Sequence, residues 1–334
     1  MGAPDRGMKS RYLIWLNWPE PPFRLNYSDL EFFRSLVVGE VVAVRSESAF
    51  LRELPFATHA ICWEFKKEWF DRSKNLRVLA TPGAGRELLP SDADMPEGTV
   101  KFHGGFHGPI MSETVIAYML AWCRGLFAAY GWQREGGEAN LWRRADFGNC
   151  CFTLAGTKAV ILGYGKIGRA TGEKLEALGV SVKGISRRNF AELSDAVAEA
   201  DWLVCVLPSD TGTDDIVDAR LLRKMKRSAV IVNVGRGNAI DEQALAEALR
   251  KRRIAAAFLD VFKREPLTAQ SPLASDIPGL FRFPHGSAFS PDYLKGFFRE
   301  LLEKGLVLGD FRTALGGKPN RRRVGGKKGE KVSR

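Results

Sequence analysis

Three polar side chains stand where apolar segments of the chain give way to loops. Arg236 follows Asn-Val-Gly, Glu265 lies in Asp-Val-Phe-Lys-Arg-Glu-Pro, and His285 follows Phe-Pro. A guanidinium can fork onto a carboxylate, and an imidazole beside a carboxylate keeps a transferable proton near neutral pH. Taken singly, each has a plainer interpretation as a solvated charge or a structural histidine. Together they suit a site that polarises the carbonyl of an anionic substrate and protonates its oxygen.

A glycine turn precedes these side chains in the sequence. Gly163, Gly165 and Gly168 have the spacing G-x-G-x-x-G directly after an apolar run over residues 159–162. In a dinucleotide-binding turn the first glycine permits the tight turn, the second lets a pyrophosphate approach the backbone, and the third lets the following helix pack closely. That helix directs its free N–H groups and positive dipole end at the phosphates. We therefore expect a nucleotide site, with an ordinary strand-to-helix turn as the alternative.

The next strand, over residues 180–185, ends without the carboxylate that would bind the ribose hydroxyls of NAD. Ser186, Arg187 and Arg188 stand there instead. A hydroxyl and two guanidiniums can bind a 2′-phosphate through charge-assisted hydrogen bonds, so we predict NADP(H) over NAD(H). The alternative is a pair of solvated surface arginines.

The three polar segments, in this order, resemble a known family. N-x-x-R-G around Arg236, D-V-F-x-x-E-P around Glu265 and P-H at His285 are similar to motifs of the D-isomer-specific 2-hydroxyacid dehydrogenases, which include glyoxylate/hydroxypyruvate reductases. The resemblance runs from about Leu79 to the Gly-Gly-Lys-Pro near residue 319 and is looser before it. It implies an oxidoreductase that transfers a hydride from NAD(P)H to a small 2-keto acid, giving the D-2-hydroxy acid. Its catalytic residues would be Arg236, Glu265 and His285.

The same resemblance implies further contacts. Gly83, Ala84 and Gly85 would form the loop whose amides hold the substrate carboxylate, together with Arg236. The full set of expected cofactor contacts, of which Leu207, Pro208, Thr213 and Asp260 come from the resemblance, is Gly163, Gly165, Lys166, Ile167, Gly168, Ser186, Arg187, Arg188, Leu207, Pro208, Thr213, Val234, Gly235 and Asp260. A homodimer is expected, and no metal is.

Some positions depart from the family pattern and leave alternatives open. Arg86-Glu87 replaces the small or apolar residue and Asp that commonly follow the glycine loop, and Ser209-Asp210 replaces the usual apolar-Thr pair. The Arg86 cation could favour a second acidic group on the substrate or could point to solvent. The rival interpretation is a non-catalytic, dinucleotide-sensing binding protein like the corepressors that resemble these dehydrogenases. A formate-type enzyme is disfavoured because Glu265 stands where that branch has Gln.

The distribution of charge and the spacing of the cysteines argue against several other classes of protein. The formal net charge is +11, of which +7 belongs to residues 318–334, where eight Lys or Arg accompany one Glu. We expect a disordered basic tail there, and nucleic-acid binding is not expected. Five cysteines without metal-ligand spacing predict reduced thiols. Since there is no signal peptide and no apolar run of about 18 residues, we expect a cytoplasmic protein that does not bind membranes.

Strands and helices alternate along the chain, which is typical of α/β proteins with parallel sheets. We predict two Rossmann-like or flavodoxin-like doubly wound domains, the nucleotide domain inserted into the substrate domain. The substrate domain would comprise residues 1–110 and 288–317, and the NAD(P)-binding domain residues 111–287. Residues 90–110 are expected to form a hinge loop with His103 and His107 exposed. Ser112 is expected to cap one apolar helix over residues 112–129.

The individual elements follow from the apolar runs and the turn residues between them. Strands are expected over residues 12–16, 41–44, 60–63, 77–80, 159–162, 180–185, 202–207, 229–234 and 256–261. Helices are expected over residues 28–36, 49–54, 67–70, 112–129, 218–225, 241–249 and 291–311.

Overall fold

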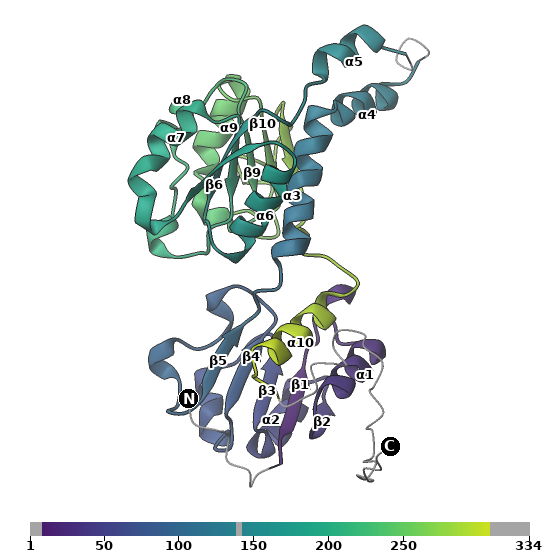
Figure 1. Ribbon diagram of the computed structural model, residues 1–334, viewed down its shortest axis with the longest axis vertical. Helices are drawn as coiled ribbons and strands as arrows, with labels where there is room; N and C mark the ends of the chain where they lie inside the picture. Colours follow the sequence, from purple (N-terminus) through teal and green to yellow (C-terminus); the bar gives the residue numbers. More distant parts are fainter. Residues whose placement is uncertain (1–8, 138–141, 308–334) are drawn as a thin grey trace, which may run out of the picture.

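The chain forms two lobes, each built on a parallel β-sheet, in a computed structural model that describes residues 9–137 and 142–307 (Figure 1). The second sheet is inserted between the last strand of the first lobe and the helix that completes that lobe. The predicted fold class, two parallel-sheet α/β domains of which one interrupts the other, is confirmed. The expected basic tail, residues 318–334, lies outside the described residues.

The elements alternate as βα units. The strands are β1 Arg11–Trp15, β2 Glu40–Ala43, β3 His59–Cys62, β4 Val78–Thr81, β5 Val100–His103, β6 Lys158–Leu162, β7 Ser181–Ile185, β8 Trp202–Cys205, β9 Val230–Asn233, β10 Ala256–Leu259 and β11 Leu280–Arg282. The helices are α1 Tyr27–Leu36, α2 Glu47–Glu53, α3 Gly108–Cys123, α4 Leu126–Glu135, α5 Arg144–Cys150, α6 Lys166–Ala177, α7 Leu193–Glu199, α8 Ala219–Lys224, α9 Glu242–Arg250 and α10 Tyr293–Glu303. None of these helices is long and apolar enough to cross a bilayer.

Both sheets are doubly wound. The first lobe has strand order β2-β1-β3-β4-β5, with α1 and α10 on one face and α2 on the other. The second lobe has order β11-β10-β9-β8-β6-β7, so its strand order reverses at β6, with β7 on one side and β8 on the other. Ligands of open α/β sheets bind at such a switch point, beyond the carboxyl ends of the strands. The topology therefore places the predicted glycine turn, which follows β6, at the expected binding edge.

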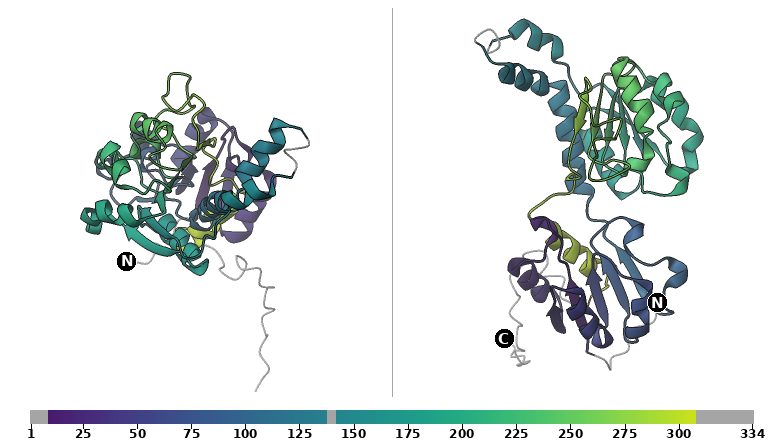
Figure 2. Two further views of the ribbon diagram at one scale, coloured as in Figure 1. Left: turned by 90° about the horizontal axis from the view of Figure 1, so that it is seen from above. Right: turned by 180° about the vertical axis from the view of Figure 1, so that it is seen from behind.

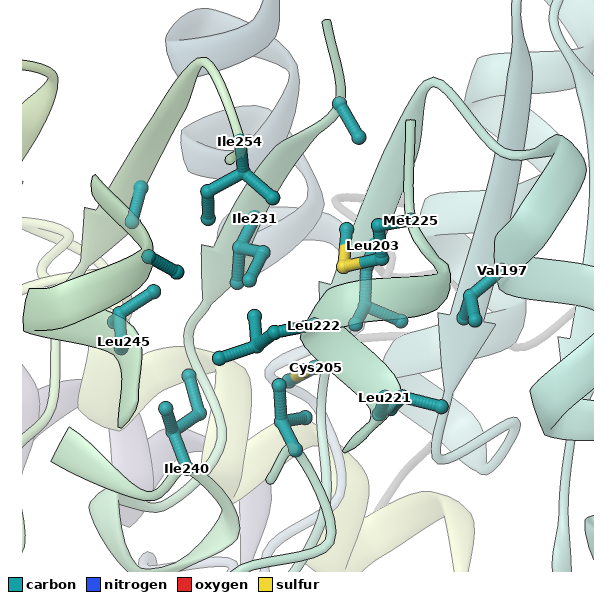
Figure 3. Packing of buried hydrophobic residues seen from close by; sticks show 14 of the residues in the cluster. Val197, Leu203, Cys205, Leu221, Leu222, Met225, Ile231, Ile240, Leu245 and Ile254 are labelled. Carbon is teal, nitrogen blue, oxygen red and sulfur yellow. The ribbon is translucent and has the colours of Figure 1, made fainter. Parts of the chain in front are cut away.

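The core of the second lobe is apolar on both faces of its sheet. One face packs against α7, α8 and α9, with Val197, Leu222 and Leu245 buried against Leu203 and Ile231 (Figure 3). The other face is covered by α3 and α6. Strands buried on both faces read as continuous apolar runs, which is why β6, β8, β9 and β10 were predictable.

The expected helix over residues 112–129 is wrong in two respects. The chain forms α3 and α4 as separate helices because Gly125, at φ +63°, adopts the left-handed conformation between them. Ser112 is not a cap, since α3 already begins at Gly108 and the Ser112 Oγ donates to the Pro109 carbonyl oxygen. Beyond this break, α4 and α5 project from the body of the second lobe (Figures 1 and 2).

Two strands and two helices were not predicted from the sequence. β5 lies within the expected hinge loop, β11 lies in the segment 265–284 that was expected to be a loop, and neither α5 nor α7 was expected. β5 and β11 are edge strands with partly exposed side chains, so they lack the apolar run that marks a central strand. Residues 67–70 belong to a 3₁₀ helix, Lys67–Arg72, and the last helix ends at Glu303 rather than continuing toward residue 311.

Helix α6 approaches the end of β6 closely because Gly168 has no side chain. A Cβ at this position would lie 2.3 Å from the Gly163 carbonyl oxygen and 3.2 Å from Ile161 Cγ2. Gly131, in α4, is the opposite case: a Cβ there would meet no atom within 4 Å. Alanine substitutions at these two positions therefore distinguish the effect of a backbone clash from the effect of helix propensity.

We predict that Gly168→Ala lowers the free energy of unfolding by about 1–3 kcal/mol, because α6 must move off β6. Gly131→Ala is the matched control and should be neutral or stabilising by up to about 1 kcal/mol, since alanine favours the helix. Urea unfolding followed by circular dichroism measures both midpoints. Equal midpoints for the two variants would show that α6 has room to shift.

Candidate functional site

A groove of about 1060 Å³ lies between the two lobes. Its lining comes mostly from loops that follow the carboxyl ends of strands in both sheets, which is where open α/β sheets bind ligands. The predicted site residues that line it are Gly83, Ala84, Gly85, Ile167, Leu207, Pro208, Val234, Gly235, Arg236, Glu265 and His285. The fold therefore brings the three polar segments and the expected substrate loop into one cavity.

His285 and Glu265 are hydrogen-bonded to each other. The His285 Nδ1 lies 2.7 Å from Glu265 Oε2, and Glu265 Oε1 accepts the Phe262 N–H at 2.9 Å. The hydrogen bond to the carboxylate raises the pKa of His285 above its ordinary value, against the opposing effect of burial. Burial acts to raise the pKa of Glu265, but the bonds from His285 and Phe262 outweigh it and lower that pKa. The pair thus favours an imidazolium beside a carboxylate.

Asp260 fixes the loop that carries His285. Its buried carboxylate accepts the N–H groups of Gly286 and Ser287, both at 2.8 Å, and its carbonyl oxygen accepts the N–H of His285 at 2.8 Å. These bonds hold His285 at φ +52°, a left-handed conformation that a non-glycine residue rarely adopts. Both carboxylate oxygens are therefore engaged by the protein. These bonds give Asp260 a positioning role, and its expected contact with the cofactor stays a prediction.

Arg236 extends from the loop after β9 toward the first lobe. Its Nη1 donates to the Gly235 carbonyl oxygen at 3.0 Å, and its Nη2 donates to Glu87 Oε1 at 3.1 Å. The Arg236 side chain is 29% exposed and lines the groove. Because Glu87 belongs to the first lobe, this ion pair spans the groove.

The loop Gly83-Ala84-Gly85 follows β4 and lies next to this ion pair. A Cβ at Gly85 would lie 2.2 Å from Glu87 Oε1 and 2.6 Å from Arg236 Nη2, so any side chain there would displace both. The Thr81 Oγ1 accepts the Gly83 N–H at 3.4 Å and donates to the Trp63 carbonyl oxygen at 3.0 Å. The loop, the guanidinium and a carboxylate thus meet at one point.

The glycine turn has the geometry of a phosphate-binding turn. Gly163 has φ +102°, and a Cβ there would lie 2.6 Å from the Val206 carbonyl oxygen. Gly165 faces open space, since a Cβ would meet no atom within 4 Å. α6 begins at Lys166, so its free N–H groups lie beside this open backbone. A pyrophosphate therefore has access to the turn, as the spacing predicts.

Lys166 is engaged by the first lobe. Its Nζ lies 3.1 Å from Glu300 Oε1, and Glu300 Oε2 accepts the Gly105 N–H at 2.6 Å. Glu300 is buried on α10, whereas the lysine side chain is mostly exposed. The pair ties the start of α6 to the first lobe and leaves the ammonium accessible to a phosphate.

The residues after β7 lie on the surface, away from the groove lining. Arg187 Nη2 pairs with Asp210 Oδ2 at 2.5 Å, while the Arg188 guanidinium has no partner among the described residues. The Ser186 Oγ donates to Asn189 Oδ1 at 3.0 Å. Thr213 is buried, and its hydroxyl lies within hydrogen-bond distance of the Pro208 and Asp210 carbonyl oxygens, so it shapes the loop after β8.

Two residues of the groove were missed or misjudged from the sequence. Glu87 was noted only as a departure from the family pattern, and the side chain of its neighbour Arg86 lies outside what the structure describes. The expectation that His107 is an exposed bystander is wrong: it is buried, and its Nε2 lies 2.8 Å from the Tyr293 hydroxyl. Burial lowers the pKa of His107 to about 4, so the ring is neutral at physiological pH. No signal in a glycine-rich segment marks such burial.

In the described part of the chain, no cluster of three or more His, Cys, Asp or Glu side chains is arranged to hold a metal ion. The five cysteines are free thiols.

Comparison with known proteins gives consistent matches. Glyoxylate/hydroxypyruvate reductase B of Pectobacterium carotovorum is 33% identical over 237 residues, which are 66% of this chain and 72% of that protein. Among solved structures, a D-isomer specific 2-hydroxyacid dehydrogenase family protein from Aeromonas salmonicida has a TM-score of 0.71 at 27% identity, covering 93% of this chain and 98% of that one. The NADPH-dependent glyoxylate/hydroxypyruvate reductase of Sinorhizobium meliloti, solved with NADP and sulfate, has a TM-score of 0.70 at 26% identity, covering 92% and 99%.

The family model agrees with the second lobe. Residues 116–287 match the NAD binding domain of the D-isomer specific 2-hydroxyacid dehydrogenases. This segment includes the open glycine turn, Arg236, Glu265 and His285, the features that the groove brings together. By sequence, fold and site, the chain is a member of the D-isomer specific 2-hydroxyacid dehydrogenase family.

Proposed function

We propose that the protein reduces a small 2-keto acid, of the glyoxylate or hydroxypyruvate kind, to the D-2-hydroxy acid. A reduced nicotinamide dinucleotide would be the hydride donor. The observation that carries this proposal is the His285–Glu265 pair, 2.7 Å from Nδ1 to Oε2, in the same groove as Arg236 and the glycine loop. The names of the relatives from Pectobacterium and Sinorhizobium support the substrate class.

When bound, a reduced nicotinamide supplies the hydride, and the protein supplies geometry and electrostatics. Hydride addition at C2 turns the carbonyl oxygen into an alkoxide, which needs a proton and a nearby positive charge. With its Nδ1 held by Glu265, His285 can present the proton on Nε2 to that oxygen. Arg236 can fork onto the substrate carboxylate and carbonyl oxygen, while amides of Gly83–Gly85 hold the other side of the carboxylate.

The two lobes would divide this work. We propose that residues 111–287 bind the dinucleotide and that residues 1–110 with 288–317 bind the substrate carboxylate. The open backbone at Gly165 supports the first part, and the position of Gly83–Gly85 after β4 supports the second. Leu207, Pro208, Val234 and Gly235 line the groove between these regions and would contact the cofactor.

The cofactor is proposed to be NADP(H) rather than NAD(H). No acidic residue stands at positions 186–191 after β7, and Arg188, whose guanidinium has no partner among the described residues, is available to a 2′-phosphate. Arg187 is available only in competition with Asp210. Ser186 would add a hydroxyl beside them. The solved Sinorhizobium relative holds NADP, which is consistent with this preference.

A homodimer in the cytoplasm is also proposed. The region from α3 to the end of α5 exposes Leu126, Tyr130 and Trp142, and such apolar surface away from a ligand groove suits a subunit interface. Five free thiols suit a reducing compartment. The non-catalytic alternative is not favoured, because the residues needed for proton transfer are assembled and the relatives are named as enzymes.

A screen of NADPH and NADH oxidation with glyoxylate and hydroxypyruvate tests the function. We predict turnover by the wild type and a fall in kcat of about 10²- to 10⁴-fold for His285→Ala, since the variant lacks the proton donor. His59→Ala, in the first-lobe sheet and outside the groove lining, is the control for losing an imidazole. Wild-type turnover in His285→Ala would remove the proposed mechanism.

The pH profile tests the role of Glu265. Reduction needs imidazolium, so kcat/KM is full below the pKa of His285 and is lost as pH rises through it. Because Glu265 raises that pKa, Glu265→Gln should lower it and move the alkaline limb of kcat/KM to lower pH. An alkaline limb that stays in place would mean that another group donates the proton.

Arg188→Ala tests the cofactor preference. The KM for NADPH should rise about tenfold, as expected for the loss of one charge-assisted hydrogen bond, while the KM for NADH stays unchanged. Arg227→Ala is the control, because Arg227 precedes the amino end of β9 in the same sheet, whereas Arg188 follows the carboxyl end of β7. A wild-type enzyme that prefers NADH would contradict the assignment outright.

A further inference from the structure

One wall of the groove, in the first lobe, is aromatic beyond what the proposed reaction of a small acid requires. Trp18, Phe23, Trp63 and Phe289 line it together. The ring centroids of Phe23 lie 5.7 Å from Trp63 and 4.8 Å from Phe289, and those of Trp18 and Trp63 lie 5.6 Å apart. Trp18 and Phe289 keep 38% and 42% of their surface exposed, so this aromatic wall is open to a ligand.

The aromatic wall is joined to the expected carboxylate loop by hydrogen bonds. Thr81 links the Gly83 amide to the Trp63 carbonyl oxygen, and the Trp63 Nε1 donates to the Phe23 carbonyl oxygen at 3.0 Å. A substrate whose carboxylate is held at Gly83–Gly85 therefore has the wall beside it. Its side chain, if it has one, can extend along these rings.

The charged side chains on the first-lobe side of the groove are all negative. Of the described first-lobe residues that line the groove, Glu20 and Glu87 are the charged ones, and none is Lys or Arg. Glu87 is paired with Arg236 across the groove, whereas Glu20 forms no salt bridge with any described residue. The first-lobe side of the groove thus carries one carboxylate that is not neutralised by an ion pair within the described part of the chain.

Glu20 is left incompletely satisfied by the protein. Its Oε2 is shielded from solvent and accepts no hydrogen bond from the part of the chain that the structure describes. A shielded carboxylate oxygen without a donor is costly and calls for a partner. The guanidinium of Arg24, four residues on, donates instead to the Trp18 and Pro19 carbonyl oxygens. Arg282, also in the groove lining, has its Nη1 engaged by three carbonyl oxygens.

We propose that the aromatic wall (Trp18, Phe23, Trp63 and Phe289) and the neighbouring Glu20 together form a subsite. This subsite would bind the far end of a longer 2-keto acid that carries a guanidinium or ammonium group. The inference rests on the proposed function, which it extends from the reacting end of the substrate to its side chain. Aromatic faces attract a cation, a guanidinium stacks on them, and Glu20 supplies the missing counter-charge. A second carboxylate at that end would meet Glu20 and is rejected.

Three 2-keto acids of equal backbone length test the subsite, with glyoxylate as the reference. These are 2-oxopentanoate, 2-oxoglutarate and 5-guanidino-2-oxopentanoate, which end in a methyl, a carboxylate and a guanidinium. We expect kcat/KM of the guanidino acid to exceed that of 2-oxopentanoate about tenfold, and that of 2-oxoglutarate to fall about tenfold below it. In Glu20→Gln the first ratio should fall close to one.

Glu68→Gln is the matched control. Glu68 is exposed in the 3₁₀ helix Lys67–Arg72 and does not line the groove, so the same charge change there should leave both ratios as in the wild type. The urea midpoint of Glu20→Gln shows whether it is folded. If it is not, the order of the three acids with the wild type still decides.

The outcomes separate the two proposals. Turnover of glyoxylate with equal kcat/KM for the three longer acids overturns the subsite and leaves the proposed function standing. Absence of turnover with every acid overturns the proposed function. In that case calorimetric titration of the wild type with the guanidino acid and with 2-oxopentanoate tests the subsite alone, and equal dissociation constants overturn it.

Discussion

The geometry of the groove depends on the carboxylate of Asp260. It is buried at the end of β10 and accepts two backbone N–H groups from the loop after His285, while its own carbonyl oxygen accepts a third. Three hydrogen bonds to one residue hold His285 in a backbone conformation that is otherwise unfavourable. Glu265 lies in the loop after the same strand, where its Oε1 accepts the Phe262 N–H and its Oε2 meets His285. Asp260 thereby fixes the imidazole member of the proton-transfer pair from the end of β10.

The second constraint is electrostatic and involves both lobes. Arg236 pairs with Glu87, and Lys166 pairs with Glu300, so these two cations of the second lobe are each balanced by a carboxylate of the first lobe. An anionic cofactor and an anionic substrate would compete with these carboxylates for the same cations. Such competition would couple ligand binding to the two ion pairs that join the lobes. The glycine turn does not depend on these ion pairs, because the backbone at Gly165 is open and has no side chain to be displaced.

The sequence was sufficient for the parts of the molecule that follow a periodic or motif rule. Central strands read as apolar runs, and Gly163, Gly165 and Gly168 each behave as their spacing predicts. Edge strand β5 was invisible because it is short and half exposed, and the helix break at Gly125 was hidden by apolar residues on both sides. Glu87 and His107 could not be assigned, because their partners Arg236 and Tyr293 are distant in the chain and only the fold brings them together.

The insertion of one lobe into the other has a consequence for synthesis. Helix α10 covers a face of the first-lobe sheet with Phe297, Phe298 and Leu301, all fully buried, yet it follows the whole second lobe in the chain. On the ribosome, strands β1–β5 emerge long before α10 is synthesised. Their apolar face therefore stays uncovered while the second lobe is translated. The second lobe, a continuous segment with its own core, can fold first, reversing the usual N-terminal-first order. During that interval the nascent first lobe exposes apolar surface, which favours aggregation until α10 covers it.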